Sequence, residues 1–204
     1  MPLELVHKFV PASGSDLTVL LLHGTGGDEN DLLPIGRGLA PGAALLSPRG
    51  PVNENGMARF FRRFGEGVFD EADIRVRAVE LARFVRGAAE EYHFDPARVA
   101  ALGYSNGANI AAAELLLEPT VLSGAVLLRA TQPLEADPPP TLPGTPVLIL
   151  AGQHDPILPA AGTQKLARSL AAAGASVELR WHNLGHELGP EDFNAARDFL
   201  KQLL

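Results

Sequence analysis

The sequence predicts one α/β domain built on a mostly parallel sheet, and three observations support this prediction. Short apolar runs alternate with longer segments of helical periodicity along the whole chain. Several of the apolar runs are hydrophobic at successive positions, which is typical of strands covered on both faces. The length of 204 residues fits one domain, which we expect to span residues 1–204.

Each expected strand is a short apolar run bounded by turn-forming residues. The expected strands cover residues 17–22, 43–46, 98–102, 124–128, 146–150 and 176–181, and an additional edge strand covers 3–10. Apolar residues recur at helical spacing in most of the segments between them. These segments predict helices over residues 31–39, 71–92, 106–117, 160–173 and 191–203.

Two connections interrupt the alternation of strands and helices. Residues 47–69 form a long stretch without clear periodicity, and residues 131–145 contain five prolines. The second stretch fits a stiff loop better than a flexible linker between domains. Neither connection is long enough for a lid, so we expect an open, shallow site without a cap domain.

The composition excludes several classes of function. The 17 basic and 24 acidic residues give a net charge of −7, which argues against an extended surface for nucleic acid or anionic membranes. The absence of cysteine excludes disulfides, thiolate metal sites and a cysteine nucleophile. The first residues lack the apolar segment of a signal peptide, and no apolar run is long enough to cross a bilayer. We therefore expect a cytoplasmic protein.

The segment Gly103-Tyr-Ser-Asn-Gly107 is the first motif that indicates a catalytic role. It lies between an expected strand and an expected helix, where a Gly-x-Ser-x-Gly sequence forms a sharp turn with its serine at the tip. Small residues on both sides of the serine let the strand and the helix approach each other. The motif predicts that Ser105 is a nucleophile.

A serine nucleophile needs a base, and the base needs an acid that orients it. Asp155 and His186 each follow a later expected strand, in the order serine, acid, base. His182 is the alternative base, but it lies at the end of its strand, whereas His186 follows in a loop. Asp137 is the alternative acid, in the proline-rich loop. The pattern favours Asp155 and His186.

A glycine-rich segment, His23-Gly-Thr-Gly-Gly-Asp28, follows the first long apolar strand. Such a loop can direct a backbone N–H toward an oxyanion, and the residue after the nucleophile can supply a second N–H. The segment predicts that Thr25 and Asn106 form an oxyanion hole and that His23 anchors the loop.

Metal and nucleotide sites fit the sequence poorly. His182 and His186 are spaced like metal ligands on a helix, but Gly185 argues against a helix there, so we expect no metal. The glycine-rich segment lacks the third glycine of a dinucleotide fingerprint and the lysine of a phosphate-binding loop.

The motifs, their order and their strand contexts resemble the α/β-hydrolase superfamily, and specifically its small bacterial carboxylesterase/phospholipase branch. This branch is akin to dienelactone hydrolases and acyl-protein thioesterases. The resemblance covers nearly the whole chain and rests on residues 23–31, Gly103–Gly107, Asp155-Pro156 and Gly185-His186. It implies an esterase with a Ser105/His186/Asp155 triad, no cofactor and a small-molecule ester as substrate. A homodimer is an open alternative to the monomer.

Departures from the family pattern bear on the substrate. Acyl-protein thioesterases carry glutamine after the nucleophile, whereas this chain has Asn106, and Arg129 follows a strand where they have a Ser-Gly turn. These differences argue against the deacylation of long-chain substrates and favour small aromatic or acidic esters as substrates. We expect Phe60, Phe61 and Arg129 to contact the substrate, with core packing and a structural salt bridge as the alternatives. A thioesterase, a lysophospholipase and a non-catalytic binding protein on the same fold are the alternative functions.

Overall fold

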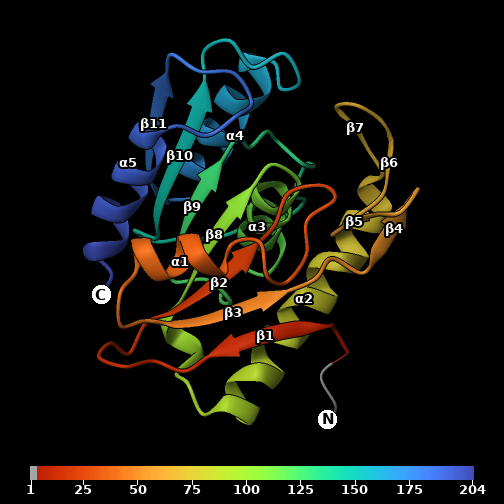
Figure 1. The fold of residues 1–204 in the computed structure, drawn as a ribbon. Coiled ribbons are helices and arrows are strands. Elements are labelled where there is room, and N and C mark those ends of the chain that lie inside the picture. Colours follow the sequence, from red (N-terminus) through yellow and green to blue (C-terminus); the bar gives the residue numbers. More distant parts are fainter. Residues whose placement is uncertain (1–3) are drawn as a thin grey trace.

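A seven-stranded sheet forms the centre of the computed structural model, which describes residues 4–204 (Figure 1). Only β1 is antiparallel to its neighbour, and the six other strands are parallel. The order across the sheet is β1 (His7–Val10), β3 (Ala44–Pro48), β2 (Thr18–Leu22), β8 (Val99–Tyr104), β9 (Gly124–Leu128), β10 (Pro146–Gly152) and β11 (Ser176–His182). The mostly parallel sheet flanked by helices is confirmed.

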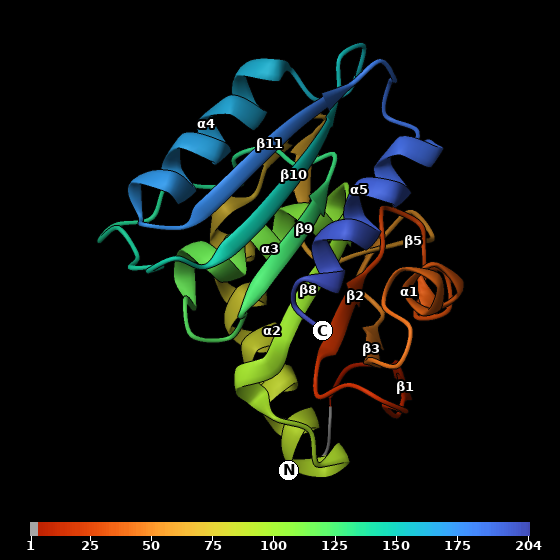
Figure 2. The same ribbon diagram turned by 90° about the vertical axis from the view of Figure 1, so that its left-hand side faces the viewer.

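Helices cover both faces of the sheet, as Figure 2 shows from the side. One face carries α1 (Leu33–Leu39) and α5 (Pro190–Lys201). The other carries α2 (Glu71–Tyr92), α3 (Asn106–Leu117) and α4 (Ala160–Ala172). A short 3₁₀ helix at Pro96–Arg98 leads into β8.

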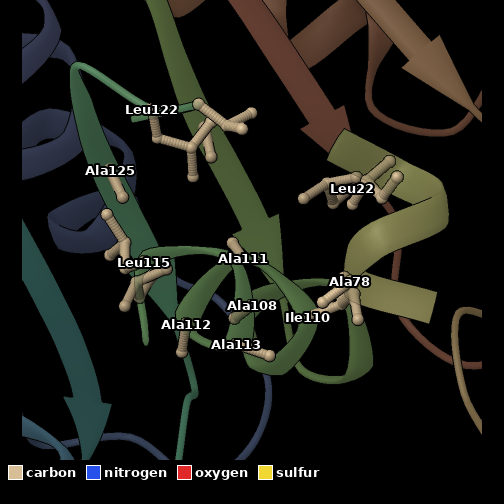
Figure 3. Close-up of a cluster of buried hydrophobic side chains, with 14 of the residues drawn as sticks. Leu22, Ala78, Ala108, Ile110, Ala111, Ala112, Ala113, Leu115, Leu122 and Ala125 are labelled. Carbon is tan, nitrogen blue, oxygen red and sulfur yellow. The ribbon is translucent and has the colours of Figure 1, made fainter. Parts of the chain in front are cut away.

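The central strands are apolar at successive positions because each strand contributes to two cores. In β2, Leu20 and Leu22 belong to the core under α2 and α3, whereas Val19 and Leu21 belong to the core under α1 and α5. Helix α3 is buried almost all round, with alanines that let it approach β8 closely (Figure 3). This packing fixes the turn at the start of α3 relative to the sheet.

The long stretch without periodicity contains structure that the sequence did not predict. Its residues form two small antiparallel hairpins, β4 (Val52–Glu54) with β5 (Met57–Arg59) and β6 (Arg63–Gly65) with β7 (Val68–Phe69). The proline-rich stretch 131–145 has no helix or strand, as expected. Helix α1 begins two residues later than predicted, and residue 3 of the expected edge strand lies outside the described residues. None of the helices in residues 4–204 has both the length and the apolar character to cross a membrane.

Candidate active site

Ser105 lies at the turn between β8 and α3, with a backbone φ of 52° and ψ of −112°. Residues other than glycine rarely adopt positive φ, so this turn holds backbone strain. The Ser105 N–H donates to the Leu128 carbonyl of the neighbouring strand β9 at 2.8 Å. The turn is thus fixed to the sheet, and Ser105 lies half-buried at the carboxyl end of the strands.

The two glycines of the motif are required by close backbone approach. A Cβ atom at Gly103 would lie 2.5 Å from the Gly107 carbonyl oxygen, and one at Gly107 would lie 1.9 Å from the Leu22 carbonyl oxygen. Any larger residue would therefore separate α3 from β8 or from β2. The same contact brings the first turn of α3 against the loop that follows β2.

His186 connects Ser105 with Asp155. The Ser105 hydroxyl lies 2.9 Å from His186 Nε2, and His186 Nδ1 lies 2.8 Å from Asp155 Oδ2. The other carboxylate oxygen, Asp155 Oδ1, accepts the backbone N–H groups of Ile157 at 2.8 Å and Leu158 at 3.0 Å. The hydroxyl, imidazole and carboxylate thus form one continuous hydrogen-bonded chain.

The loop that carries His186 is held through three consecutive backbone carbonyls. Arg129 Nε donates to the Gly185 carbonyl at 2.9 Å, and Arg129 Nη2 donates to the Glu187 carbonyl at 2.7 Å. Between them, the Tyr104 hydroxyl donates to the His186 carbonyl at 3.1 Å. Burial raises the pKa of Tyr104, which keeps the hydroxyl protonated as a donor. Strands β8 and β9 thereby position the loop.

The structure places the two alternative residues away from this chain of hydrogen bonds. His182 Nδ1 lies 2.8 Å from Asp192 Oδ1, so this imidazole is directed at α5. Asp137 is exposed in the proline-rich loop. Neither residue has a hydrogen bond to Ser105 or His186 within residues 4–204.

The prediction that Arg129 contacts substrate is wrong. Its side chain is fully buried and forms a bidentate pair with Asp192, with Nη1–Oδ1 at 2.9 Å and Nη2–Oδ2 at 2.8 Å. Nη1 also donates to the Leu150 carbonyl at 3.2 Å, so with the bonds to the His186 loop all five N–H donors are occupied. Burial raises the pKa of Asp192, but the hydrogen bonds from Arg129, Gly189 and His182 outweigh burial and lower it overall.

The expectation that Phe60 and Phe61 contact substrate also fails. Both rings are in the core, with at most 2% of either residue exposed, and they belong to the same cluster as the buried faces of α2 and α3. Phe60 packs on the His23 ring at 4.8 Å between centroids, and Phe61 meets Phe69 edge-on at 5.3 Å. Core packing was the alternative, and it explains both residues.

His23 anchors the glycine-rich loop, as expected. Its Nδ1–H donates to the Gly24 carbonyl at 2.7 Å, and its Nε2 accepts the Gly50 N–H at 2.9 Å. Burial lowers the pKa of His23, which favours the neutral ring that these two bonds require. Within the described residues, the backbone N–H groups of Thr25 and Asn106 have no protein acceptor.

A sequence profile of the family described as phospholipase/carboxylesterase matches residues 9–204. The chain belongs to the phospholipase/carboxylesterase family. This membership makes it a hydrolase of carboxylic esters with the α/β-hydrolase fold.

Related proteins agree with this family assignment. The chain is 47% identical over 190 residues to "Putative hydrolase MhqD" of Bacillus subtilis (strain 168), covering 93% of this chain and 95% of that one. Its fold matches the crystal structure of the Bacillus cereus carboxylesterase with a TM-score of 0.95 and 42% identity, covering 98% and 95% of the two chains. It also matches a structure of YahD with malic acid, with a TM-score of 0.90 and 30% identity, covering 98% and 100%.

Three residues of this family member's site were missed by the sequence reasoning. Tyr104 holds the loop that carries His186 directly, and Asp192 holds it through Arg129. Arg59 Nη1 donates to Thr25 Oγ1 at 2.5 Å. Tyr104 lies inside the serine motif, so its position offered a signal. Arg59 directly precedes Phe60 and Phe61, in a segment that the sequence already connects with the substrate. Asp192 offered no signal, because only the fold brings it to the site.

Proposed function

We propose that the protein hydrolyses small carboxylic esters through a covalent acyl-enzyme, with Ser105 as nucleophile, His186 as base and Asp155 as orienting acid. The hydrogen-bonded chain from the Ser105 hydroxyl through His186 to Asp155 carries this proposal. Each link is within hydrogen-bond reach, as nucleophile activation requires.

In the first step Ser105 Oγ attacks the ester carbonyl carbon while its proton passes to His186 Nε2. Collapse of the tetrahedral intermediate breaks the bond to the alcohol oxygen, which takes the proton from His186. A water molecule then attacks the acyl carbon and gives a proton to the same nitrogen. Release of the acid returns that proton to Ser105.

The tetrahedral oxygen carries negative charge and needs preorganised donors. We assign these donors to the backbone N–H groups of Thr25 and Asn106. Their lack of protein acceptors supports the assignment, as does the approach of the α3 start to the loop after β2. Asn106 Oδ1 accepts the Phe60 N–H at 2.7 Å, which orients the Asn106 side chain away from this role.

The names of the relatives support an esterase of small substrates. One solved relative is a carboxylesterase, and another was solved with malic acid, which is a small dicarboxylic acid. The half-buried position of Ser105 at the sheet edge is consistent with an open site that takes short acyl groups.

A fluorophosphonate probe and a panel of p-nitrophenyl esters of increasing chain length test the proposal. The wild type should be labelled and should favour short esters. Ser105→Ala should abolish labelling and lower kcat by about 10⁴–10⁶. Ser123→Ala is the matched control, because that hydroxyl donates to the Val99 carbonyl at the opposite end of the sheet. Equal hydrolysis by the wild type and Ser105→Ala would overturn the assignment.

A further inference from the structure

Two buried arginines lie beside the candidate active site, and they differ in how their donors are used. All five N–H donors of Arg129 have protein acceptors. Only two donor bonds are formed by Arg59 within the described residues, Nε to the Phe61 carbonyl at 3.2 Å and Nη1 to Thr25 Oγ1. A guanidinium carries five N–H donors, so Arg59 has donors left with which to bind a ligand, whereas Arg129 has none.

The side chain of Arg59 is rigidly placed. Only 3% of it is exposed, and its guanidinium carbon lies 5.7 Å from the centroid of the Phe61 ring. The neighbouring Ala58 carbonyl accepts the Gly26 N–H at 2.9 Å, which ties the end of β5 to the glycine-rich loop. Arg59 therefore stands next to Thr25 without needing to be ordered by a ligand.

The charge of Arg59 is incompletely compensated. Glu54 is its nearest carboxylate, 3.9 Å from Nε, which is too long for a hydrogen bond. The same Glu54 carboxylate lies 3.0 Å from Arg63 Nε, so one anion serves two cations. Burial and the Arg63 charge both lower the pKa of Arg59, as expected of a cation that lacks a close anion.

Arg59 Nη2 is a donor that the protein does not fully enclose. It has no acceptor within residues 4–204, and the unpaired polar side-chain atoms that are fully enclosed belong to other residues. Nη2 therefore keeps some accessible area, and it belongs to the same guanidinium as the Nη1 that contacts Thr25.

We infer that Arg59 forms a subsite for a carboxylate group on the substrate, which makes the protein selective for esters that carry a second, free carboxylate. The inference rests on the proposed function, because the subsite is placed by its contact with the proposed oxyanion residue Thr25. A planar carboxylate matches the free edge of the guanidinium and supplies the anion that Arg59 lacks. The acid group and the ester carbonyl are then bound by neighbouring groups, so a short spacing fits.

Two pairs of esters test the subsite from either side of the scissile bond. p-Nitrophenyl hydrogen glutarate is compared with p-nitrophenyl valerate, which has the same acyl length without the charge. 4-Acetoxybenzoate is compared with its methyl ester, which places the charge on the leaving group. The measured quantity is the ratio of kcat/KM for the charged ester to that for the neutral ester.

Arg59→Met should lower this ratio roughly 10-fold to 100-fold for at least one pair, because it removes a charged hydrogen bond. Arg59→Lys keeps the charge without the fork and should give an intermediate ratio. Arg63→Met is the matched control, since it removes a neighbouring charge on the same Glu54, and its ratio should change less than about threefold.

An unchanged ratio in Arg59→Met for both pairs would overturn the subsite, and so would an equal fall in Arg63→Met. If Arg59→Met does not fold, as judged by its circular dichroism melt, Arg59→Lys decides, and an unchanged ratio there overturns the proposal. Failure of the wild type to hydrolyse any of the esters would instead overturn the proposed function.

Discussion

The position of Ser105 depends on a backbone conformation that its own residue type disfavours. Positive φ costs a serine of order 1–3 kcal/mol, and the hydrogen bond to Leu128 and the packing of α3 hold it there. A strained residue that the surroundings over-determine is typical of functional sites. The strain supports the same interpretation of Ser105 as the hydrogen-bonded chain does.

The two histidines His182, at the end of β11, and His186, in the loop after it, should respond differently to substitution. His186→Ala removes the proposed base and should lower kcat about as far as Ser105→Ala. His182→Ala removes only a contact to Asp192, which keeps its two bonds to Arg129, so kcat should fall by less than about tenfold. Steady-state kinetics on one short ester would measure both. The reverse ranking would assign the base to His182.

At the scale of elements, Arg129 directly follows β9 and positions residues 185–187, the loop that carries the proposed base His186 and is called the base loop below. Arg129 adopts a φ of 56°, and from this conformation it reaches the carbonyls on both sides of His186. Removal of one partner from a buried pair costs about 3–5 kcal/mol, whereas removal of both partners costs much less. The contribution of Arg129 to the stability of the fold can therefore be measured separately from its contribution to the position of the base loop.

Arg129→Met should be strongly destabilised because it leaves the Asp192 carboxylate buried without a cation. The double variant Arg129→Met/Asp192→Leu should recover most of the Tm but not kcat, with KM changed less than kcat, because the carbonyls of the loop stay unbound. Arg98→Met is the control, since Arg98 donates to the Leu203 carbonyl at 2.7 Å far from the site. Recovery of kcat together with Tm would show that Arg129 is only structural.

Helix α3 carries a buried acid that should make stability depend on pH. Both carboxylate oxygens of Glu114 are enclosed without a partner, and burial raises its pKa well above 4.5. The folded state therefore holds a proton that the unfolded chain releases above about pH 4.3. The stability that this proton supplies is complete below that pH and is lost as the pH rises toward the folded pKa.

The Glu114→Gln variant has no ionisable group at this position. Its Tm should therefore rise relative to the Tm of the wild type as the pH is raised from 4 to 8. Thermal melts of both proteins across this range measure the effect. Glu118→Gln is the control, because Glu118 is paired with Arg86 at 2.9 Å and its carboxylate is partly exposed. A Tm difference between Glu114→Gln and the wild type that does not change with pH would contradict the expectation.

At the scale of the whole molecule, the sequence was sufficient to predict the sheet because the strands between its two edges are buried on both faces. Continuous apolar runs such as those of β2 and β9 are unusual outside a parallel sheet, so they predicted both the class and the strand positions. The hairpins of residues 52–69 were missed because strands of two or three residues are too short to show alternation.

The sequence placed Ser105, Asp155 and His186 in loops that follow parallel strands, and the fold brings the three together. It did not reveal which polar residues the fold would enclose. Arg129 at the end of a strand looks the same whether its partner is a substrate or Asp192, and Asp192 lies 63 positions away. Pairings between distant elements are the part of a site that local pattern cannot supply.

The contact between Gly152 and the base loop has a consequence for heat inactivation. A Cβ atom at Gly152 would lie 2.0 Å from the Gly185 carbonyl oxygen, so the loops that carry Asp155 and His186 touch through their backbones. Because Arg129 and Tyr104 also hold the base loop, we expect Ser105, Asp155 and His186 to stay together until the sheet itself opens. Esterase activity and circular dichroism should therefore disappear at the same temperature, and activity lost several degrees earlier would mean that the site melts on its own.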